Sequence, residues 1–283
     1  MPNLDADLFD RLERFYDAVP RDSSVAEEFG SLVLFVRDGA GWPYYARPRL
    51  NATEAPSAAD ITAARSRQRQ LGLPESLEWV HETTPDLLAV ARSAGLSVLL
   101  APLLVLDPAL LPEVDELTDV PVRLVDPGTP SFDADIAVRR AVAQIGFGAA
   151  GTSVGPAGAA ERDAAVVEQS ADEVAEERRR AAAGRLTSAL ADSPTDGVLA
   201  SGVLQRVGDV AEIAGIATLP AARRRGLGAA VTAVLARHAL DTGVDLVLLS
   251  AGSDDIARVY TRVGFRRVGT ACIAEPGFDA PIG

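Results

Sequence analysis

Three consecutive arginines followed by two glycines are the residues of this chain that most clearly indicate chemistry. The run is R-R-R-G-L-G over residues 223–228, and it lies between an apolar segment closed by Pro220 and a sequence of high helical propensity. The first N–H groups of a helix have no partner within the helix and lie at the positive end of its dipole. Glycines let a phosphate approach the backbone, and arginine suits phosphate geometry. The run therefore predicts an anion site, with the charge to bind a diphosphate.

The spacing of the run excludes two common phosphate motifs. It matches neither G-x-x-x-x-G-K-[ST], the P-loop, nor G-x-G-x-x-G, the dinucleotide fingerprint. Two plainer interpretations stay open: an arginine run before a helix can be a solvated loop, and two glycines can form only a tight turn. The surrounding sequence has to decide between these readings.

The run lies within a regular alternation of strand and helix patterns. Hydrophobic periodicity and turn residues predict an antiparallel meander followed by strand–helix–strand–helix–strand, which is a mixed α+β arrangement whose sheet changes to parallel pairing. The predicted elements are a helix at 132–146, an uncharged loop at 147–160, a charged and mostly solvated helix at 161–184, strands at 185–191, 197–206 and 211–219, a helix at 227–241, a strand at 245–250, a helix at 254–263 and a strand after Gly264.

The first half of the chain has a similar order of elements. A helix at 58–71, a strand at 76–80, a helix at 85–94 and a strand or strand pair at 96–106 are separated by nearly the same gaps, which suggests an internal repeat. Any α/β unit could also give this order. The equivalent helix begins S-A-A-D-I-T-A-A-R without the arginine–glycine run, so no comparable phosphate loop is expected there. Prolines and acidic residues at 107–119 indicate a linker, and we place domains at 1–112 and 120–283 with a linker at 113–119.

The motifs of the second half form an ordered set. E-I-x-x-I-x-T-x-P begins at Glu212, R-x-x-G-x-G at Arg223, and Y-x-x-x-G-F at Tyr260 after the next strand. This set resembles the GNAT acyl-CoA-dependent N-acetyltransferases, well from about Val210 to Glu275 and more loosely back to Val120. The resemblance implies an α+β, GNAT-like acyl-CoA N-acyltransferase fold, with two tandem GNAT-like units of which the first is degenerate.

The resemblance also implies roles for individual residues. Glu212 matches a glutamate that deprotonates the amine through water, and Tyr260 matches a tyrosine that acts as general acid near the CoA sulfur. Each has a plainer reading, because Glu212 could lie on a solvated strand face and Tyr260 shares an apolar helical face with Val259. The residues expected at the cosubstrate are Ile216, Ala217, Thr218, Arg223, Arg224, Arg225, Gly226, Leu227, Gly228, Ala229 and Ser253, the last at a position where the family often has asparagine.

Composition narrows the class of protein. The formal net charge of −13 argues against nucleic-acid binding and fits an amine substrate. Cys272 is the only cysteine, and His81 and His238 lie far apart, so we expect no metal. The acidic N-terminal sequence lacks the apolar core of a signal peptide, and the longest apolar run is too short to cross a bilayer, so we expect a cytoplasmic protein without membrane contact.

These observations predict a function. The leading hypothesis is an acetyl-CoA-dependent N-acetyltransferase that modifies a primary amine, with acetyl-CoA as cosubstrate and no metal. The sequence does not distinguish acceptors, or a monomer from a homodimer. The alternative is a catalytically inactive acyl-CoA-binding or regulatory module, and a scaffold without a ligand would leave the arginine–glycine run unexplained.

Overall fold

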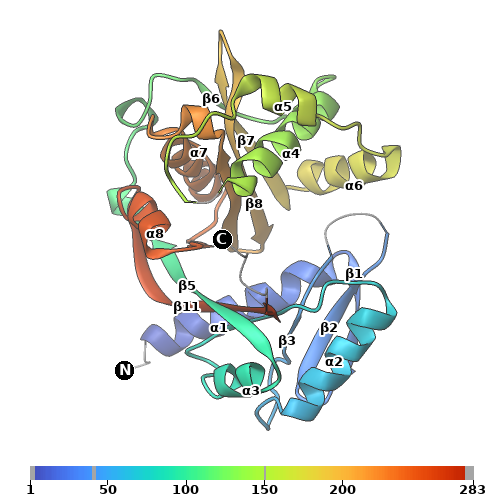
Figure 1. Cartoon of the computed structure of the whole chain (residues 1–283). Coiled ribbons are helices and arrows are strands. Elements are labelled where there is room, and N and C mark those ends of the chain that lie inside the picture. The colour runs from blue at the N-terminus through green and yellow to red at the C-terminus, as the bar shows by residue number, and fades with distance from the viewer. Residues whose placement is uncertain (1–3, 40–42, 150, 278–283) are drawn as a thin grey trace. The chain divides into compact units, whose positions relative to one another are not determined.

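The computed structural model describes residues 4–39, 43–149 and 151–277. Contacts within the chain divide it into two compact units, one of residues 1–103 with 268–283 and the other of residues 104–267. We call them unit 1 and unit 2. Both contain helices and strands, and Figure 1 labels those for which there is room.

Unit 2 is a sheet covered by helices on both faces. Its strands follow the order β5-β10-β9-β8-β7-β6, antiparallel from β6 to β9 and parallel between β9 and β10. The hydroxyl of Ser201 on β8 donates to the carbonyl of Arg139 on α4 (3.3 Å), whereas a Cβ on neighbouring Gly202 would lie 3.0 Å from Val231 of α7. Successive strand residues point to opposite faces, so α4 and α7 cover opposite sides of the sheet (Figure 1). The elements are β6 (Val122–Leu124), α4 (Phe132–Gly148), α5 (Ala159–Ala165), α6 (Ala171–Ala182), β7 (Leu186–Ser193), β8 (Gly197–Val207), β9 (Val210–Thr218), α7 (Leu227–Asp241), β10 (Leu246–Ser250) and α8 (Asp254–Thr261), with short 3-10 helices η1 (Pro108–Leu110), η2 (Val114–Glu116) and η3 (Pro220–Ala222).

Unit 1 repeats the topology of unit 2. Its pairs β1–β2 and β2–β3 are antiparallel and β3–β4 is parallel, as β7–β8, β8–β9 and β9–β10 are in unit 2. Ile61 of α2 and Leu87 of α3 pack against Trp79 of β4 in its core. The predicted α+β fold with two tandem GNAT-like units is therefore confirmed. The elements are α1 (Leu4–Arg21), β1 (Ser24–Phe29), β2 (Leu32–Arg37), β3 (Ala46–Pro48), α2 (Ala58–Gln70), β4 (Leu77–Val80), α3 (Leu87–Ser93), β5 (Leu96–Leu106) and β11 (Phe265–Pro276).

The last strand of each repeat runs into the other unit. β11 follows α8 in sequence, yet its later part belongs to unit 1, where Ala271–Ala274 pair antiparallel with β4. β5 follows α3, and its last residues from Leu104 belong to unit 2, where β5 neighbours β10. Unit 1 is consequently not continuous in sequence, whereas unit 2 is one continuous segment. The domain limits expected from composition, 1–112 and 120–283, stay a prediction.

Several elements differ from those expected. Strand β1 was not predicted, and the segment expected as one helix over 161–184 forms α5 and α6. Ser170 ends the interruption with a capping box: its hydroxyl accepts from the Glu173 amide (3.3 Å), and Glu173 accepts from the Ser170 amide (3.2 Å). Such a box starts a new helix. The segment expected as a linker contains η2 and is fixed to α7, because Arg237 donates to the carbonyl of Pro112 (3.1 Å).

The predicted solvated face of 161–184 is wrong for Glu177. This carboxylate is buried and bridges two arginines of α4, Arg139 at 2.6 Å and Arg140 at 3.0 Å. Burial lowers the pKa of Arg139, and the facing carboxylate opposes that effect. The ion pairs of Glu177 join α6 to α4, and removal of one partner would leave a buried charge uncompensated.

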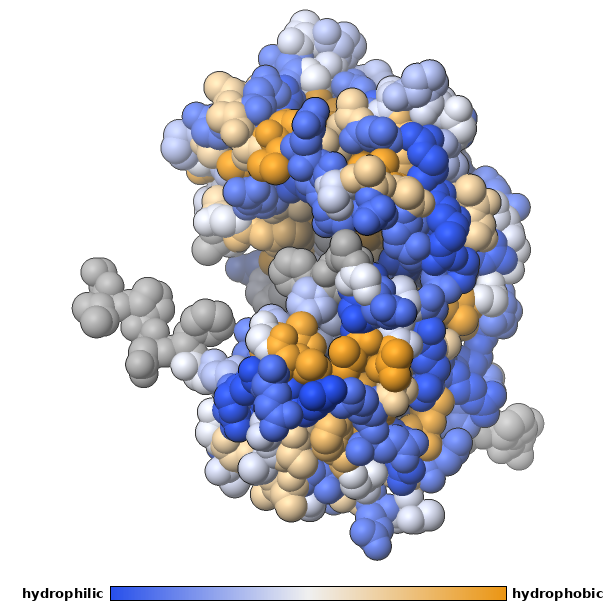
Figure 2. Space-filling model, turned by 90° about the vertical axis from the view of Figure 1, so that its right-hand side faces the viewer, coloured by the Kyte–Doolittle hydropathy of each residue, from blue (hydrophilic) through white to orange (hydrophobic). Residues whose placement is uncertain are grey.

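Hydrophilic residues cover most of the face shown in Figure 2, and hydrophobic residues gather there in small separate patches. In the described part of the chain, no helix is both long and apolar enough to cross a membrane.

Replacing Glu177 with alanine should lower the free energy of unfolding by about 3–5 kcal/mol, because the buried guanidinium of Arg139 would lose its partner. Urea unfolding measures this change. Glu176→Ala is the matched control on the same helix, because Glu176 pairs with Arg179 at the surface (2.6–2.8 Å), and surface pairs contribute little. Equal losses in the two variants would contradict a structural role for the buried pair.

Candidate functional site

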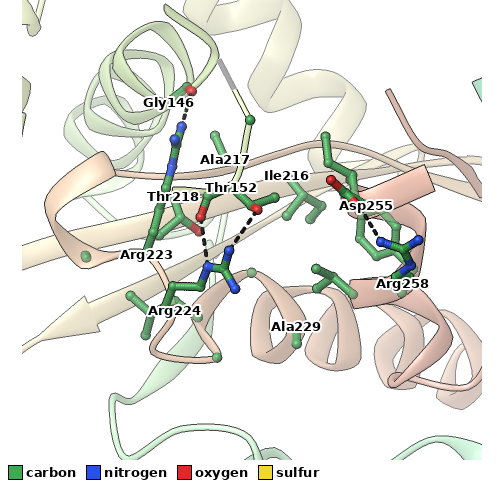
Figure 3. Close-up of a pocket in the computed structure, with 18 of the residues that line it drawn as sticks. Gly146, Thr152, Ile216, Ala217, Thr218, Arg223, Arg224, Ala229, Asp255 and Arg258 are labelled. Atoms are coloured by element: carbon green, nitrogen blue, oxygen red, sulfur yellow. Dashed lines mark hydrogen bonds and ion pairs between the residues drawn. The ribbon is translucent and has the colours of Figure 1, made fainter. Parts of the chain in front are cut away.

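A cavity of about 890 Å³ lies in unit 2 between the end of β9, the start of α7 and the side of α8. Figure 3 shows residues from these elements, and from the segment after α4, facing one another across it. Ten of the predicted site residues line it: Ile216, Ala217, Thr218, Arg223, Arg224, Gly226, Leu227, Gly228, Ala229 and Tyr260. Glu212, Arg225 and Ser253 do not.

The cavity forms where β9 leaves β10. The parallel ladder joins Val210–Glu212 to Leu246–Leu248 and ends there, although both strands continue. Beyond this point β9 carries a bulge: Ser201 and Val203 of β8 face Ala217 and Ala214, so two residues of β9 oppose one of β8. Gly215 adopts a φ of +62° within it. A bulge bends its strand and ends regular alternation, which turns the edge of Ile216–Thr218 toward the cavity.

The two glycines of the run have different functions. Gly226 precedes α7 with a φ of +76°, and a Cβ there would lie 1.9 Å from the carbonyl oxygen of Leu117. Gly226 therefore allows the turn and the approach of the segment after η2. Gly228 lies in the first turn of α7, where a Cβ would make ordinary contacts with Thr218 at 3.4 Å and Ile216 at 3.6 Å. Its missing side chain keeps the cavity open beside the helix N-terminus.

The three arginines also differ. Arg223 donates to the carbonyls of Gly146 and Ala149 at 2.8 Å each and of Ser153 at 3.1 Å. Arg224 has a φ of +66° and donates through Nε to the carbonyl of Thr152 (3.1 Å). Arg225 is exposed and lies outside the cavity lining. The side chains expected at a diphosphate thus hold a neighbouring loop in this structure.

Tyr260 both packs in the core and lines the cavity, so it fits both interpretations of its sequence position. Its side chain is buried and packs edge-on against Phe265, with ring centroids 6.3 Å apart, and it also lines the cavity. Burial raises the pKa of Tyr260 to about 12. The phenol is therefore protonated at neutral pH and can donate a hydrogen bond into the cavity.

Glu212 and Ser253 lie away from the cavity wall. Glu212 is half-buried in β9, opposite Gln205 in the antiparallel ladder and Leu248 in the parallel one. Ser253 is the N-cap of α8, where its hydroxyl accepts from the amide of Ile256 (3.3 Å). The serine at the position of the family asparagine thus has a local structural role.

Part of the lining was not predicted from the sequence. It comes from α4 and the loop after it, from the residue after η2, from η3, and from α8 and the residue that follows it: Gly146, Phe147, Ala149, Gly151, Thr152, Leu117, Ala222, Asp255, Ile256, Arg258, Val259 and Arg262. Asp255 and Arg258 form an ion pair on the exposed side of α8 (Figure 3). Ile256 lies four residues before Tyr260 and therefore on the same helical face, so helical spacing could have indicated it. The residues from α4 have no such signal, because tertiary packing brings them there.

In unit 1 the N-terminus of α2, the counterpart of α7, has different charged groups around it. A second cavity of about 750 Å³ in unit 1 is lined by α1 and by the segments after β3 and β4. The N-terminus of α2 is capped by its own chain, because the Asp60 carboxylate accepts from the amides of Ser57 (2.9 Å) and Ser31 (3.5 Å). In unit 1 a carboxylate of the chain itself thus lies at the N-terminus of α2. In unit 2 the N-terminus of α7 borders the cavity. This arrangement gives a physical reason for the absence of a phosphate loop in the first repeat.

In the part of the chain that the structure describes, no group of three His, Cys, Asp or Glu side chains could hold a metal ion.

Comparisons with known proteins agree with the geometry of unit 2. The model of the family described as FR47-like protein matches residues 190–273, which include β9, α7 and α8. No curated protein matches the chain. Among solved structures, a GCN5-related N-acetyltransferase from Kribbella flavida is 22% identical with a TM-score of 0.63, and the match covers 94% of this chain and 96% of that one.

Two further solved structures have the same fold over nearly the whole chain. A GCN5-related N-acetyltransferase-like protein from Streptococcus suis is 12% identical with a TM-score of 0.56, covering 95% of this chain and 98% of its own. A GCN5-related N-acetyltransferase from Sphaerobacter thermophilus is 14% identical with a TM-score of 0.54, covering 95% and 87%. At these identities the likeness concerns the fold.

The two glycines should respond differently to alanine. Gly226→Ala should lower the free energy of unfolding by more than about 2 kcal/mol, since the methyl group would meet the Leu117 carbonyl and the backbone conformation disfavours any side chain. Gly228→Ala, the matched control, should be neutral or stabilising by up to about 1 kcal/mol, because alanine favours the helix. Chemical denaturation of both variants measures this. Equal destabilisation would show that the close contact at Gly226 does not form.

Proposed function

Starting from a C-terminal unit with the GNAT acetyltransferase fold, we propose that the protein transfers the acetyl group of acetyl-CoA to a primary amine. One observation carries the proposal. The diverging edge of β9, the N-terminus of α7 and the buried phenol of Tyr260 face a single cavity. These are a strand edge that can pair with an amide-containing chain, an anion site and a hydrogen-bond donor.

The residues present suit the parts of acetyl-CoA. The first-turn amides of α7, at Leu227, Gly228 and Ala229, would donate hydrogen bonds to the diphosphate. Arg225, which is exposed, lies nearby in sequence and adds positive charge. The backbone of Ile216–Thr218 would pair with the pantetheine amides and with the thioester carbonyl oxygen. Gly228 has no side chain and Ala229 a small one, so the acyl donor could reach the backbone there.

Tyr260 would stabilise the leaving sulfur. With a pKa raised to about 12, its phenol stays protonated throughout the neutral range and can donate to a developing thiolate. Thiols have a pKa of about 8.5, so complete proton transfer from Tyr260 to the thiolate is uphill. The phenol therefore acts chiefly as a hydrogen-bond donor to the sulfur, and the proton lost by the amine can complete the thiol.

Glu212 is the proposed base for the amine. Because its side chain is not part of the cavity wall, it would act through intervening water.

Titration calorimetry with acetyl-CoA tests the proposal most directly. We expect saturable binding with a Kd between about 1 μM and 1 mM, similar binding of desulfo-CoA, and much weaker binding of ATP, which lacks the pantetheine arm. Screening primary amines for release of free thiol would then follow. No binding of acetyl-CoA at millimolar concentration would overturn the proposal.

Tyr260→Phe should lower kcat about 10²- to 10⁴-fold with any accepted amine, because the sulfur loses its donor. The affinity for desulfo-CoA should change by no more than about threefold, since this ligand has no sulfur to stabilise. Tyr44→Phe is the control, as Tyr44 lies in unit 1 beside Arg37. Steady-state kinetics measures both variants. Unchanged kcat in Tyr260→Phe would remove the phenol from the mechanism.

Glu212→Gln separates the base from the alternative function. Loss of kcat together with the acidic limb of its pH profile supports Glu212 as base, whereas an unchanged profile assigns the base elsewhere. The position of Glu212 outside the cavity lining favours the second candidate, an acyl-CoA-binding module without catalysis. Saturable acetyl-CoA binding without turnover of any amine would support that candidate.

A further inference from the structure

Two arginines before α7 hold the loop that follows α4. Arg224 reaches across the cavity edge to Thr152, with Nε donating to the carbonyl oxygen (3.1 Å) and Nη2 to the hydroxyl (3.4 Å) (Figure 3). Arg223 donates to three carbonyls on the same side, those of Gly146, Ala149 and Ser153. The residues of the arginine–glycine run are thereby joined to a second wall of the cavity.

The two arginines are held with different strength. Arg223 is half-buried, and its two bonds of 2.8 Å end at Gly146 and Ala149, the C-terminal end of α4. Carbonyls at a helix C-terminus lack partners and carry the negative end of the dipole, so they bind a cation well. Arg224 is exposed, and its acceptors are one neutral carbonyl and one hydroxyl at longer distances. Arg223 is therefore the fixed contact and Arg224 the exchangeable one.

The loop is fixed again just beyond Thr152. The amide of Gly155 donates to the carbonyl of Pro220 (3.1 Å), and the amide of Ala221 donates to the carbonyl of Ala157 (2.9 Å). Only the short interval Gly151–Ser153 depends on the arginine contacts, and Gly151 and Thr152 line the cavity. A change at Arg224 would consequently act on a small, defined part of the wall.

We propose that Arg224 is a latch that binds Thr152 in the free protein and moves to the diphosphate of the acyl donor, which releases Gly151–Ser153. The inference rests on the proposed function. An arginine–phosphate contact joins two opposite charges and can be bidentate, whereas the acceptors of Arg224 at Thr152 are neutral. The phosphate is therefore the stronger acceptor for Arg224. Arg223 stays on the carbonyls of Gly146 and Ala149 as a positioning residue, and its longer bond to the carbonyl of Ser153 opens with the interval. The released interval would then open the wall for the second substrate.

The two equilibria are linked. If phosphate and Thr152 compete for Arg224, ligand binding weakens the contact between Arg224 and Thr152. By the same coupling, strengthening that contact weakens ligand binding. Replacing Thr152 with aspartate strengthens the latch by giving Arg224 a charged partner. Replacing Arg224 with glutamine abolishes the latch and one ligand contact together.

A spin label at residue 153 would report the interval directly. Ser153 is exposed and contacts Arg223 only through its carbonyl in the bonds described, so Ser153→Cys keeps that bond. The native Cys272 is buried and its pKa is raised to about 11 by burial, which leaves it unreactive during labelling. Label mobility is compared in the free protein and with saturating desulfo-CoA or inorganic pyrophosphate.

The latch predicts an ordered label in the free protein and a mobile one with either ligand. In Arg224→Gln the label should be mobile from the start and should not respond further. Arg225→Gln is the matched control: it removes the adjacent charge outside the cavity lining and should leave the label ordered in the free protein. Unchanged or reduced mobility on measured ligand binding would overturn the proposal, as would an ordered label in Arg224→Gln.

Affinity provides an independent readout. Thr152→Asp should weaken pyrophosphate binding at least about threefold, within the range of an exposed ion pair, and the effect should be smaller in the Arg224→Gln background, which retains only the repulsion between Asp and phosphate. Equal effects in both backgrounds would overturn the exchange. Failure of pyrophosphate and desulfo-CoA to bind the unmodified protein would overturn both the proposed function and the transfer step, whereas ligand binding without loop release would overturn the latch alone.

Discussion

The functional part of unit 2 depends on the place where β9 stops pairing with β10. The parallel ladder comprises only three residue pairs, and the bulge at Gly215 then bends β9 away. A buried strand edge must satisfy its amides and carbonyls, so a diverging edge either admits solvent or binds another extended chain. The cavity lies at the edge of Ile216–Thr218, beyond the last pair of this ladder. Gly202 of β8 leaves room for the side chain of Ile216, since a Cβ there would lie 2.2 Å from Ile216 Cδ1.

The two repeats show how one topology can have opposite electrostatic outcomes. In both, a helix N-terminus follows a strand that pairs in parallel with the next strand. Unit 1 neutralises the N-terminus of α2 with Asp60, which lies three residues inside a capping box. Unit 2 starts α7 with glycine, without a side-chain cap, and surrounds it with arginines. The acidic residue in the first turn of α2 thus accepts from backbone amides, whereas α7 begins without a side-chain cap.

The sequence predicts most of the elements, because their hydrophobic period and glycine ends are local signals. The arginine–glycine run, the edge of β9 and Tyr260 were found for the same reason, since they belong to one continuous strand–helix–strand–helix pattern. Contacts between distant segments were not predictable. Arg223 and Arg224 were assigned to a ligand, and nothing local indicates that their acceptors are carbonyls some 70 residues earlier, as the Arg223–Ser153 pair shows. The burial of Glu177 and the off-wall position of Glu212 are tertiary in the same way.

The charges around the cavity imply an order of events. The lining contains Arg223, Arg224, Arg258 and Arg262, and its only described carboxylate, Asp255, is already paired with Arg258. In a chain of net charge −13, this site is a local positive region, which attracts a polyphosphate and repels a protonated amine. Once a diphosphate has neutralised the arginines, the repulsion disappears and an amine can approach and lose its proton. Electrostatics and the arginine latch therefore favour the same sequence on the proposed function, with the acyl donor bound first and the amine second.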